Sequence, residues 1–100
     1  GEPFEPENQR ALLPFVREAK KRFPDKTIWC YTGNVYDPAT GLLKETDKNT
    51  EVTEELLSYI DVLVDGEFVA DLKNIRGSSN QRVLDMKKTK KSKTPVFYLD

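Results

Sequence analysis

A short polar segment, Arg-Gly-Ser-Ser-Asn-Gln-Arg at positions 76–82, holds the side chains best suited to ligand chemistry in this sequence. It places two cations, a glycine and four hydroxyl or amide groups within seven residues. Arginine pairs with anions, and hydroxyl and amide groups both donate and accept hydrogen bonds. The segment is too polar for a core, so it predicts a binding site or part of one.

Polar residues also follow two predicted strands. Thr32 and Gly33 follow an apolar strand at 27–31, and Asp65 and Gly66 follow another at 60–64. Ligands of parallel α/β sheets bind beyond the carboxyl ends of the strands, so these residues should share one rim. Asp65 could accept hydrogen bonds from an ammonium group or a ribose, although Asp-Gly is also an ordinary turn. Thr32 likewise could bind a ligand or could be an ordinary turn residue.

The elements that must position these residues alternate between helix and strand. Apolar residues at helical spacing predict a helix from Pro6 toward Arg22, kinked at Pro14. The strand at 27–31 is apolar throughout, which predicts a strand covered on both faces. A long surface loop should span 34–49, followed by a short helix to residue 59, capped by Thr50 or Thr53.

The second half of the chain predicts shorter elements. Residues 68–72 form a short helix or strand, and 82–86 and 96–99 form strands, the last at an edge because Pro95 cannot donate to a ladder. The run 86–93 contains five lysines and predicts a solvated connection, with a phosphate-binding tail as the alternative. The pattern indicates an α/β fold with a mainly parallel sheet and crossover helices.

Composition excludes several classes of protein. The 100 residues suit a single domain or a piece of one. A net charge of −1 gives no overall electrostatic field that would attract nucleic acid. No apolar run reaches membrane-spanning length, and a single cysteine without a signal peptide favours a cytoplasmic protein. With no histidine, the chain lacks the usual base of Ser-His-Asp or Cys-His catalysis, and it has neither a zinc motif nor a Walker loop.

Four segments in order carry a resemblance to a known family. These are Gly-Glu-Pro at 1–3, Ile-Trp-x-Tyr-Thr-Gly at 28–33, Asp-Val-Leu-Val-Asp-Gly-x-Phe at 61–68, and the segment 76–82. Over residues 1–86 the chain resembles the anaerobic ribonucleoside-triphosphate reductase activating proteins, which are radical S-adenosylmethionine activases. The resemblance implies a partial radical-SAM (β/α)6-type barrel. It also implies S-adenosylmethionine and a [4Fe–4S] cluster as cofactors.

The activity implied by the resemblance is the activation of a partner enzyme. Reductive cleavage of S-adenosylmethionine at the cluster gives a 5′-deoxyadenosyl radical. This radical takes a hydrogen atom from a glycine of the anaerobic reductase and leaves a glycyl radical there. The reductase is therefore the implied partner, and neither nucleic acid nor a membrane is expected.

The resemblance also implies a set of cofactor-binding residues. Gly1 and Glu2 match the end of the family's Gly-Gly-Glu-Pro motif, which lies beside the methionine amino group. Arg76 or Arg82 could pair with the cofactor carboxylate. Groups that could bond ribose or adenine edges are Ser78, Ser79, Asn80 and Gln81. Alternatively, this segment caps a strand or holds the reductase. No catalytic residue and no metal ligand is assigned.

One departure from the family is large. The family's Cys-x3-Cys-x2-Cys loop is absent, and the one cysteine, Cys30, lies in a predicted buried strand. We therefore interpret residues 1–100 as the carboxyl-terminal part of a single radical-SAM domain, inactive alone, with 87–100 a lysine-rich connection and final strand. Ile28, Trp29, Val62 and Leu63 should then be exposed, giving a marginal or self-associating fold.

Two alternative functions remain open at this stage. The chain could be a binding module without catalysis, either as a degenerate remnant or as one half of a split enzyme. It could also belong to the activase of another glycyl radical enzyme, such as pyruvate formate-lyase, which shares the Gly-Glu-Pro.

Overall fold

The longest element is the helix α1 (Pro6–Arg22), which confirms the predicted amphipathic helix. The computed structural model describes residues 2–67 and 81–98. Pro6 lies in the first turn, where its missing N–H is harmless, and the last turn carries Lys20, Lys21 and Arg22, which favour the negative end of the helix dipole. The helix continues through Pro14 as one element and buries Leu13 and Val16.

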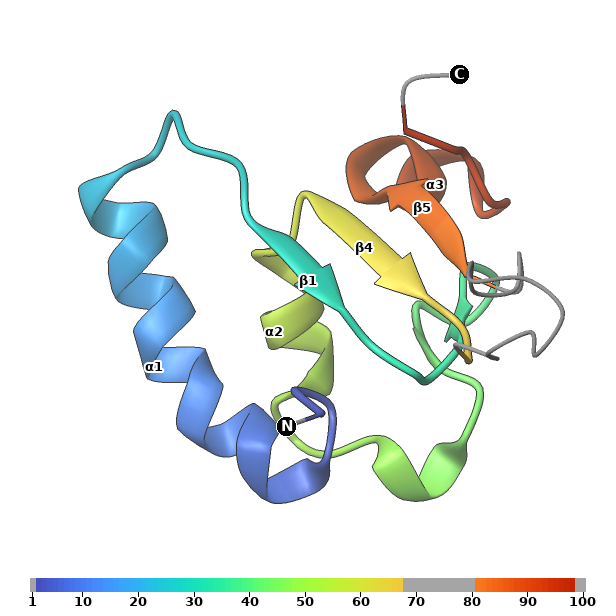
Figure 1. Ribbon diagram of the computed structural model, residues 1–100, viewed down its shortest axis with the longest axis horizontal. Coiled ribbons are helices and arrows are strands. Elements are labelled where there is room, and N and C mark those ends of the chain that lie inside the picture. The colour runs from blue at the N-terminus through green and yellow to red at the C-terminus, as the bar shows by residue number, and fades with distance from the viewer. Residues whose placement is uncertain (1, 68–80, 99–100) are drawn as a thin grey trace, which may run out of the picture.

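A three-stranded sheet forms the centre of the fold, with β1 (Trp29–Tyr31), β4 (Val62–Asp65) and β5 (Arg82–Asp85) in the order β1-β4-β5. β1 and β4 are parallel, whereas β5 runs antiparallel to β4, as the arrowheads in Figure 1 show. The α/β class is confirmed. The prediction of a mainly parallel sheet was wrong, because β5 pairs antiparallel with β4 and makes the sheet mixed.

The predicted long loop at 34–49 contains regular structure. A two-stranded antiparallel hairpin pairs β2 (Tyr36–Asp37) with β3 (Leu42–Leu43), and the 3-10 helix η1 (Thr46–Lys48) follows. Tyr36 and Leu43, which face each other in the hairpin, are both buried. Gly41 turns the chain with a φ of 78°, a conformation that favours glycine. The hairpin forms because these two apolar residues reach the core from an otherwise polar stretch.

The predicted short helix is α2 (Thr53–Ser58), and it packs against α1. Val52 directly precedes the helix and makes no side-chain cap bond, but the predicted Thr50 caps the turn that leads into it, since its hydroxyl accepts the Val52 N–H at 3.1 Å and its own N–H donates to the Thr53 hydroxyl at 2.7 Å. The hydroxyl of Thr53 donates to the buried side-chain carbonyl of Gln9 on α1. Two bidentate ion pairs on the surface add to this contact, Arg17 to Glu55 on α2 and Arg10 to Glu51 in the turn before α2.

The lysine run, predicted as a solvated connection between two strands, forms a helix that follows β5. α3 (Met86–Ser92) begins at Asp85, whose carboxylate accepts a hydrogen bond from the Lys88 N–H at 3.0 Å. Met86 and Thr89, three residues apart, are buried and anchor one face of the helix while most of the lysines face solvent. After α3 the chain returns beside β5 through a single antiparallel bridge, so the predicted last strand is shorter than expected.

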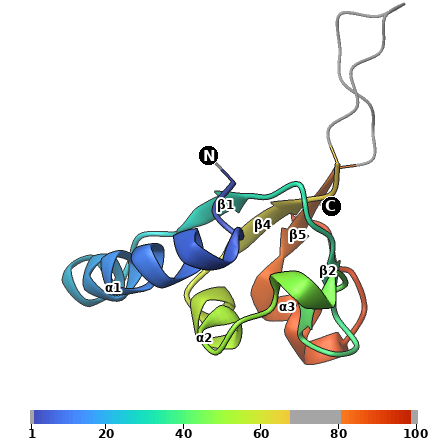
Figure 2. The same cartoon turned by 90° about the horizontal axis from the view of Figure 1, so that it is seen from below.

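All three helices lie on one face of the sheet (Figure 2). Cys30, Leu63 and Leu84 point toward them and join the buried core. The opposite face carries Trp29 and Tyr31, which are 43% and 62% exposed. The expectation of a strand covered on both faces was therefore wrong for β1, because no helix packs on that side within the described parts of the chain.

The predicted exposure of four apolar residues is met in part. Trp29 is exposed, and its ring contacts that of Tyr98 edge to face, with 5.1 Å between ring centroids. Ile28 is half-buried, whereas Val62 and Leu63 are buried. Val62 lies on the same face as Trp29 but on the central strand, where its neighbours shield it.

We expect the purified chain to self-associate through this face, since exposed aromatic residues on a sheet are a common cause of association. Trp29→Thr should shift the chain toward the monomer, as measured by size-exclusion chromatography with light scattering. Phe15→Gln is the matched control, because Phe15 is 76% exposed but lies on α1. A wild-type chain that is monomeric and melts cooperatively would contradict this expectation.

Candidate functional site

The carboxylate of Glu2 is fixed at the carboxyl end of β1. Its Oε2 accepts hydrogen bonds from the Thr32 hydroxyl at 2.7 Å and from the Phe4 N–H at 2.8 Å. Its Oε1 accepts the Gly33 N–H at 2.7 Å. A carboxylate offers about four acceptor positions, so one remains for a ligand. The sequence-predicted residues Glu2 and Thr32 are therefore brought together, although 30 positions separate them.

Thr32 holds the carboxylate of Glu2 in position. It is 3% exposed, and its backbone N–H donates to the Val64 carbonyl at 2.9 Å, which extends the pairing of β1 with β4. Its hydroxyl donates to Glu2 and accepts from both the backbone N–H and the side-chain amide of Asn34. Because this hydroxyl is already saturated, Thr32 acts through Glu2 rather than as a free ligand group.

A small hollow of about 220 Å³ opens beside Glu2. Glycines from the ends of both parallel strands line it, Gly33 after β1 and Gly66 after β4, together with Thr32 and Gln81. Gly66 has a φ of 98°, which a side chain would strain. The predicted common rim is thus present. Its volume is below the roughly 300 Å³ at which drug-sized pockets begin, so it suits one end of a ligand, of amino-acid size.

Asp65 lies deeper than predicted. It is fully buried and pairs with Arg82, from Nε to Oδ1 at 2.9 Å and from Nη2 to Oδ2 at 2.6 Å. Its Oδ2 also accepts the Tyr36 N–H at 2.7 Å, and Arg82 donates to the Tyr36 carbonyl at 2.9 Å. This hydrogen bonding also raises the pKa of Arg82. A direct ligand contact with Asp65 would require this pair to open, so a role in the site is indirect.

The remaining predicted site residues are Gly1, Arg76, Ser78, Ser79 and Asn80, all of which lie outside the described residues. Sequence reasoning missed the pairing of Asp65 with Arg82. The two residues face each other across β4 and β5, where opposite charges stabilise antiparallel strands. A prediction of antiparallel pairing between these strands would have revealed it.

The residues of this chain do not suit an iron–sulfur cluster. In the ranges 2–67 and 81–98, no group of three Cys, His, Asp or Glu side chains is placed to hold a metal ion. Cys30 is buried in β1, and burial, with a smaller contribution from the charge of Glu2, raises the pKa of its thiol to about 11. Cluster ligands are thiolates, so Cys30 has the role of a small core residue. In the described parts of the chain, no helix is long and apolar enough to cross a membrane.

Comparison with known proteins identifies the class. Residues 1–84 match the family described as 4Fe-4S single cluster domain, and the chain belongs to this family. It is 44% identical over 85 residues to the anaerobic ribonucleoside-triphosphate reductase-activating protein of Haemophilus influenzae, a match that covers 81% of this chain and 48% of that protein. These matches confirm the resemblance predicted from the sequence.

Two further proteins of the same name support the match. The identity is 40% over 85 residues for Pasteurella multocida, covering 81% of this chain and 49% of the relative. It is 35% over 86 residues for Enterobacteria phage T4, covering 83% and 47% respectively. The chain spans about half the length of the curated relatives it matches. No solved structure matches it.

We predict that the thiol of Cys30 is unreactive in the folded chain. With a pKa of about 11, almost no thiolate exists at neutral pH, and burial blocks access. Ellman's reagent should label the native chain slowly and the urea-unfolded chain rapidly. Equal rates in the two states would contradict a buried, structural cysteine.

We predict that Asp65→Asn lowers the free energy of unfolding by about 3 kcal/mol, since it leaves the Arg82 charge without its buried partner. Asparagine can still accept the Tyr36 N–H, so the loss reports the charge pair itself. Asp47→Asn, at an exposed position of η1, is the control and should change stability by less than about 0.5 kcal/mol. Urea unfolding followed by circular dichroism measures both. Equal losses would show that the pair contributes nothing specific.

Proposed function

We propose that this chain is part of an activating enzyme of the anaerobic (class III) ribonucleoside-triphosphate reductase. The enzyme generates a glycyl radical on the reductase through reductive cleavage of S-adenosylmethionine at a [4Fe–4S] cluster. Similarity to proteins named as activators of this reductase supports the proposal. So does the match to a 4Fe-4S single cluster domain.

The observation that carries the proposal is the carboxylate of Glu2, oriented by Thr32 and Gly33 at the rim of two parallel strands. Its free acceptor position suits the ammonium group of an amino acid. The size of the adjoining hollow suits the methionine end of the cofactor. Gln81 lines the same hollow and offers an amide to the cofactor carboxylate or ribose.

The other residues take supporting or unassigned roles in this proposal. Asp65 acts through Arg82, which it holds beside the hairpin. The groups proposed to complete the cofactor site are Gly1, Arg76, Ser78, Ser79 and Asn80. A [4Fe–4S] cluster would supply the electron for the cleavage of S-adenosylmethionine, and none of the described residues would hold it.

We propose further that β1, α2 and β4 form one β/α unit of a partial radical-SAM (β/α)6-type barrel. The two strands are parallel neighbours, and α2 lies between them in the sequence. Residues 1–100 would then be the carboxyl-terminal part of a single domain. A binding module without catalysis is the second candidate, favoured by the absence of a metal-binding group among the described residues.

The coding sequence upstream of Gly1 separates these two functions. An in-frame Cys-x3-Cys-x2-Cys motif followed by a second glycine is expected for the activase. The cluster-loaded product, incubated with S-adenosylmethionine, a reductant and the reductase, should give the electron paramagnetic resonance signal of a glycyl radical. A start codon at this boundary without that motif would favour the binding module.

We predict that Glu2→Gln in the complete, cluster-loaded protein weakens S-adenosylmethionine binding by about tenfold, because a charge-assisted hydrogen bond to the ammonium is lost. Equilibrium dialysis measures the affinity. Glu45→Gln, an exposed change away from the hollow, should leave it unaltered. Gln81→Ala provides a second lining variant that spares the Glu2 contacts. Unchanged affinity in both lining variants would remove the hollow from the cofactor site.

A further inference from the structure

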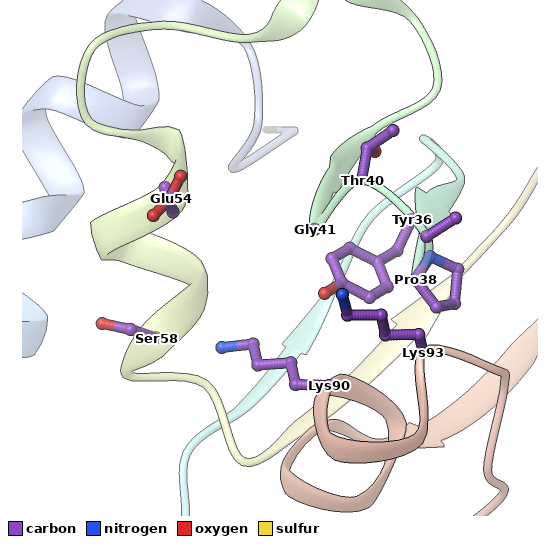
Figure 3. A pocket seen from close by; sticks show the side chains of 9 residues that line it. Tyr36, Pro38, Thr40, Gly41, Glu54, Ser58, Lys90 and Lys93 are labelled. Atoms are coloured by element: carbon purple, nitrogen blue, oxygen red, sulfur yellow. The ribbon is translucent and has the colours of Figure 1, made fainter.

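A second hollow, of about 400 Å³, lies between the β2–β3 hairpin, α2 and α3 (Figure 3). Its size falls within the range of small-molecule pockets. It shares no lining residue with the rim beside Glu2. Pro38, Ala39 and Gly41 form part of its wall, and the charged or hydrogen-bonding residues that line it are Tyr36, Thr40, Glu54, Ser58, Lys90 and Lys93.

One of these groups is a buried hydroxyl without a partner. Tyr36 is fully buried, and within the described residues its hydroxyl makes no hydrogen bond. Leaving a buried donor unpaired is unfavourable, so such a group in a native protein calls for an explanation, one of which is a bound ion. The phenol ring projects toward the hollow beside Gly41, where an added Cβ would lie 4.0 Å from the hydroxyl oxygen.

The position of this hydroxyl is fixed by the backbone. The Tyr36 N–H donates to Asp65 at 2.7 Å, and its carbonyl accepts from Arg82 at 2.9 Å. Tyr36 also pairs with Leu43 in the hairpin. Its main chain is held from both sides, and because the side chain is fully buried, packing holds the ring in place. The position of the unpaired hydroxyl is therefore fixed by the fold.

Two ammonium groups face the hollow from the last part of α3 and the residue that follows it. The side chains of Lys90 and Lys93 both extend into it (Figure 3). Lys90 donates one hydrogen bond to the Leu57 carbonyl at 2.9 Å, which leaves further donors. Burial lowers the pKa of Lys90, and the charges of Glu54 and Asp61 offset only part of this by stabilising the charged form. A bound anion would add to this stabilisation of the charged form.

Across the hollow, α2 presents a different chemistry. Glu54 and Ser58 line the hollow from this helix (Figure 3). The Ser58 hydroxyl donates to the Glu55 carbonyl of the same helix, so it can offer a ligand only an acceptor. The hollow therefore has a cationic side with a hydroxyl donor and an opposite side with acceptors. An isolated anion satisfies only the first side. A ligand with an anionic group and hydroxyl groups satisfies both.

We infer that this hollow binds a small phosphorylated ligand, with its phosphate group held by Lys90, Lys93 and the Tyr36 hydroxyl, and its hydroxyl groups facing Glu54 and Ser58. Lysine binds phosphate as a point charge, without the planar fork by which arginine recognises a carboxylate, and both cations here are lysines. Phosphate binding by the lysine run was the alternative expected from the sequence, and the fold supplies the aromatic partner for it. The inference is independent of the activase function.

The test is a titration of the 100-residue chain with inorganic phosphate and with glycerol 3-phosphate at constant ionic strength, followed by proton–nitrogen correlation spectra. We expect saturable shifts at Tyr36, Gly41 and Lys90, with tighter binding of glycerol 3-phosphate. Shifts spread evenly over all lysines would indicate charge screening alone and overturn the inference. Equal affinity for the two probes would overturn the role given to Glu54 and Ser58.

Variants separate the site from the fold. Tyr36→Phe should weaken phosphate binding by about tenfold while the melting temperature stays unchanged or rises, since the hydroxyl has no partner to lose. Lys93→Met should weaken binding similarly. Lys87→Met, also in the lysine run but not lining the hollow, is the matched control and should have no effect. A Tyr36→Phe chain that melts lower and binds phosphate normally would assign the hydroxyl to the fold and overturn the inference.

Discussion

The ion pair between Asp65 and Arg82 is the interaction on which the central part of this fold depends. Asp65 has no exposed surface, and a buried carboxylate is tolerated only when it is paired and hydrogen-bonded. The pair joins β4 to β5, and both partners also bind the main chain of Tyr36 in the hairpin. The hairpin, β4 and β5, which are distant in the sequence, are thus joined at the carboxylate of Asp65.

A second carboxylate, that of Glu2, lies at the rim of the sheet and has a different role from that of Asp65. Glu2 is partly exposed and keeps an acceptor position free, although Thr32 and Gly33 hold it in place. Each carboxylate accepts three hydrogen bonds from the protein, but that of Asp65 is fully buried, whereas that of Glu2 can still be reached by a ligand. Two acidic residues that end up near the same strand ends therefore separate into a structural and a binding role, according to burial and partners rather than residue type.

The sequence predicted the elements whose apolar pattern is strong. α1 follows from its helical periodicity, and the strands β1 and β4 follow from apolar runs ending in Thr-Gly and Asp-Gly. The direction of β5 could not be predicted, because it depends on the path of the chain before Arg82 and not on local composition. α3 was missed because only Met86 and Thr89 mark its buried face among many lysines. The role of Asp65 was missed because its partner is 17 residues away.

The one-sided arrangement of the helices divides the sheet into two populations of residues under different evolutionary constraint. Cys30, Leu63 and Leu84 pack in the core, so changes there alter the stability of this chain directly. Trp29 and Tyr31 on the other face are largely exposed, and few contacts within the described chain depend on them. Sequence variation on the core face should therefore track volume. Sequence variation on the open face should instead depend on the surface that packs against it. The residues on the two faces of one strand can therefore change at different rates.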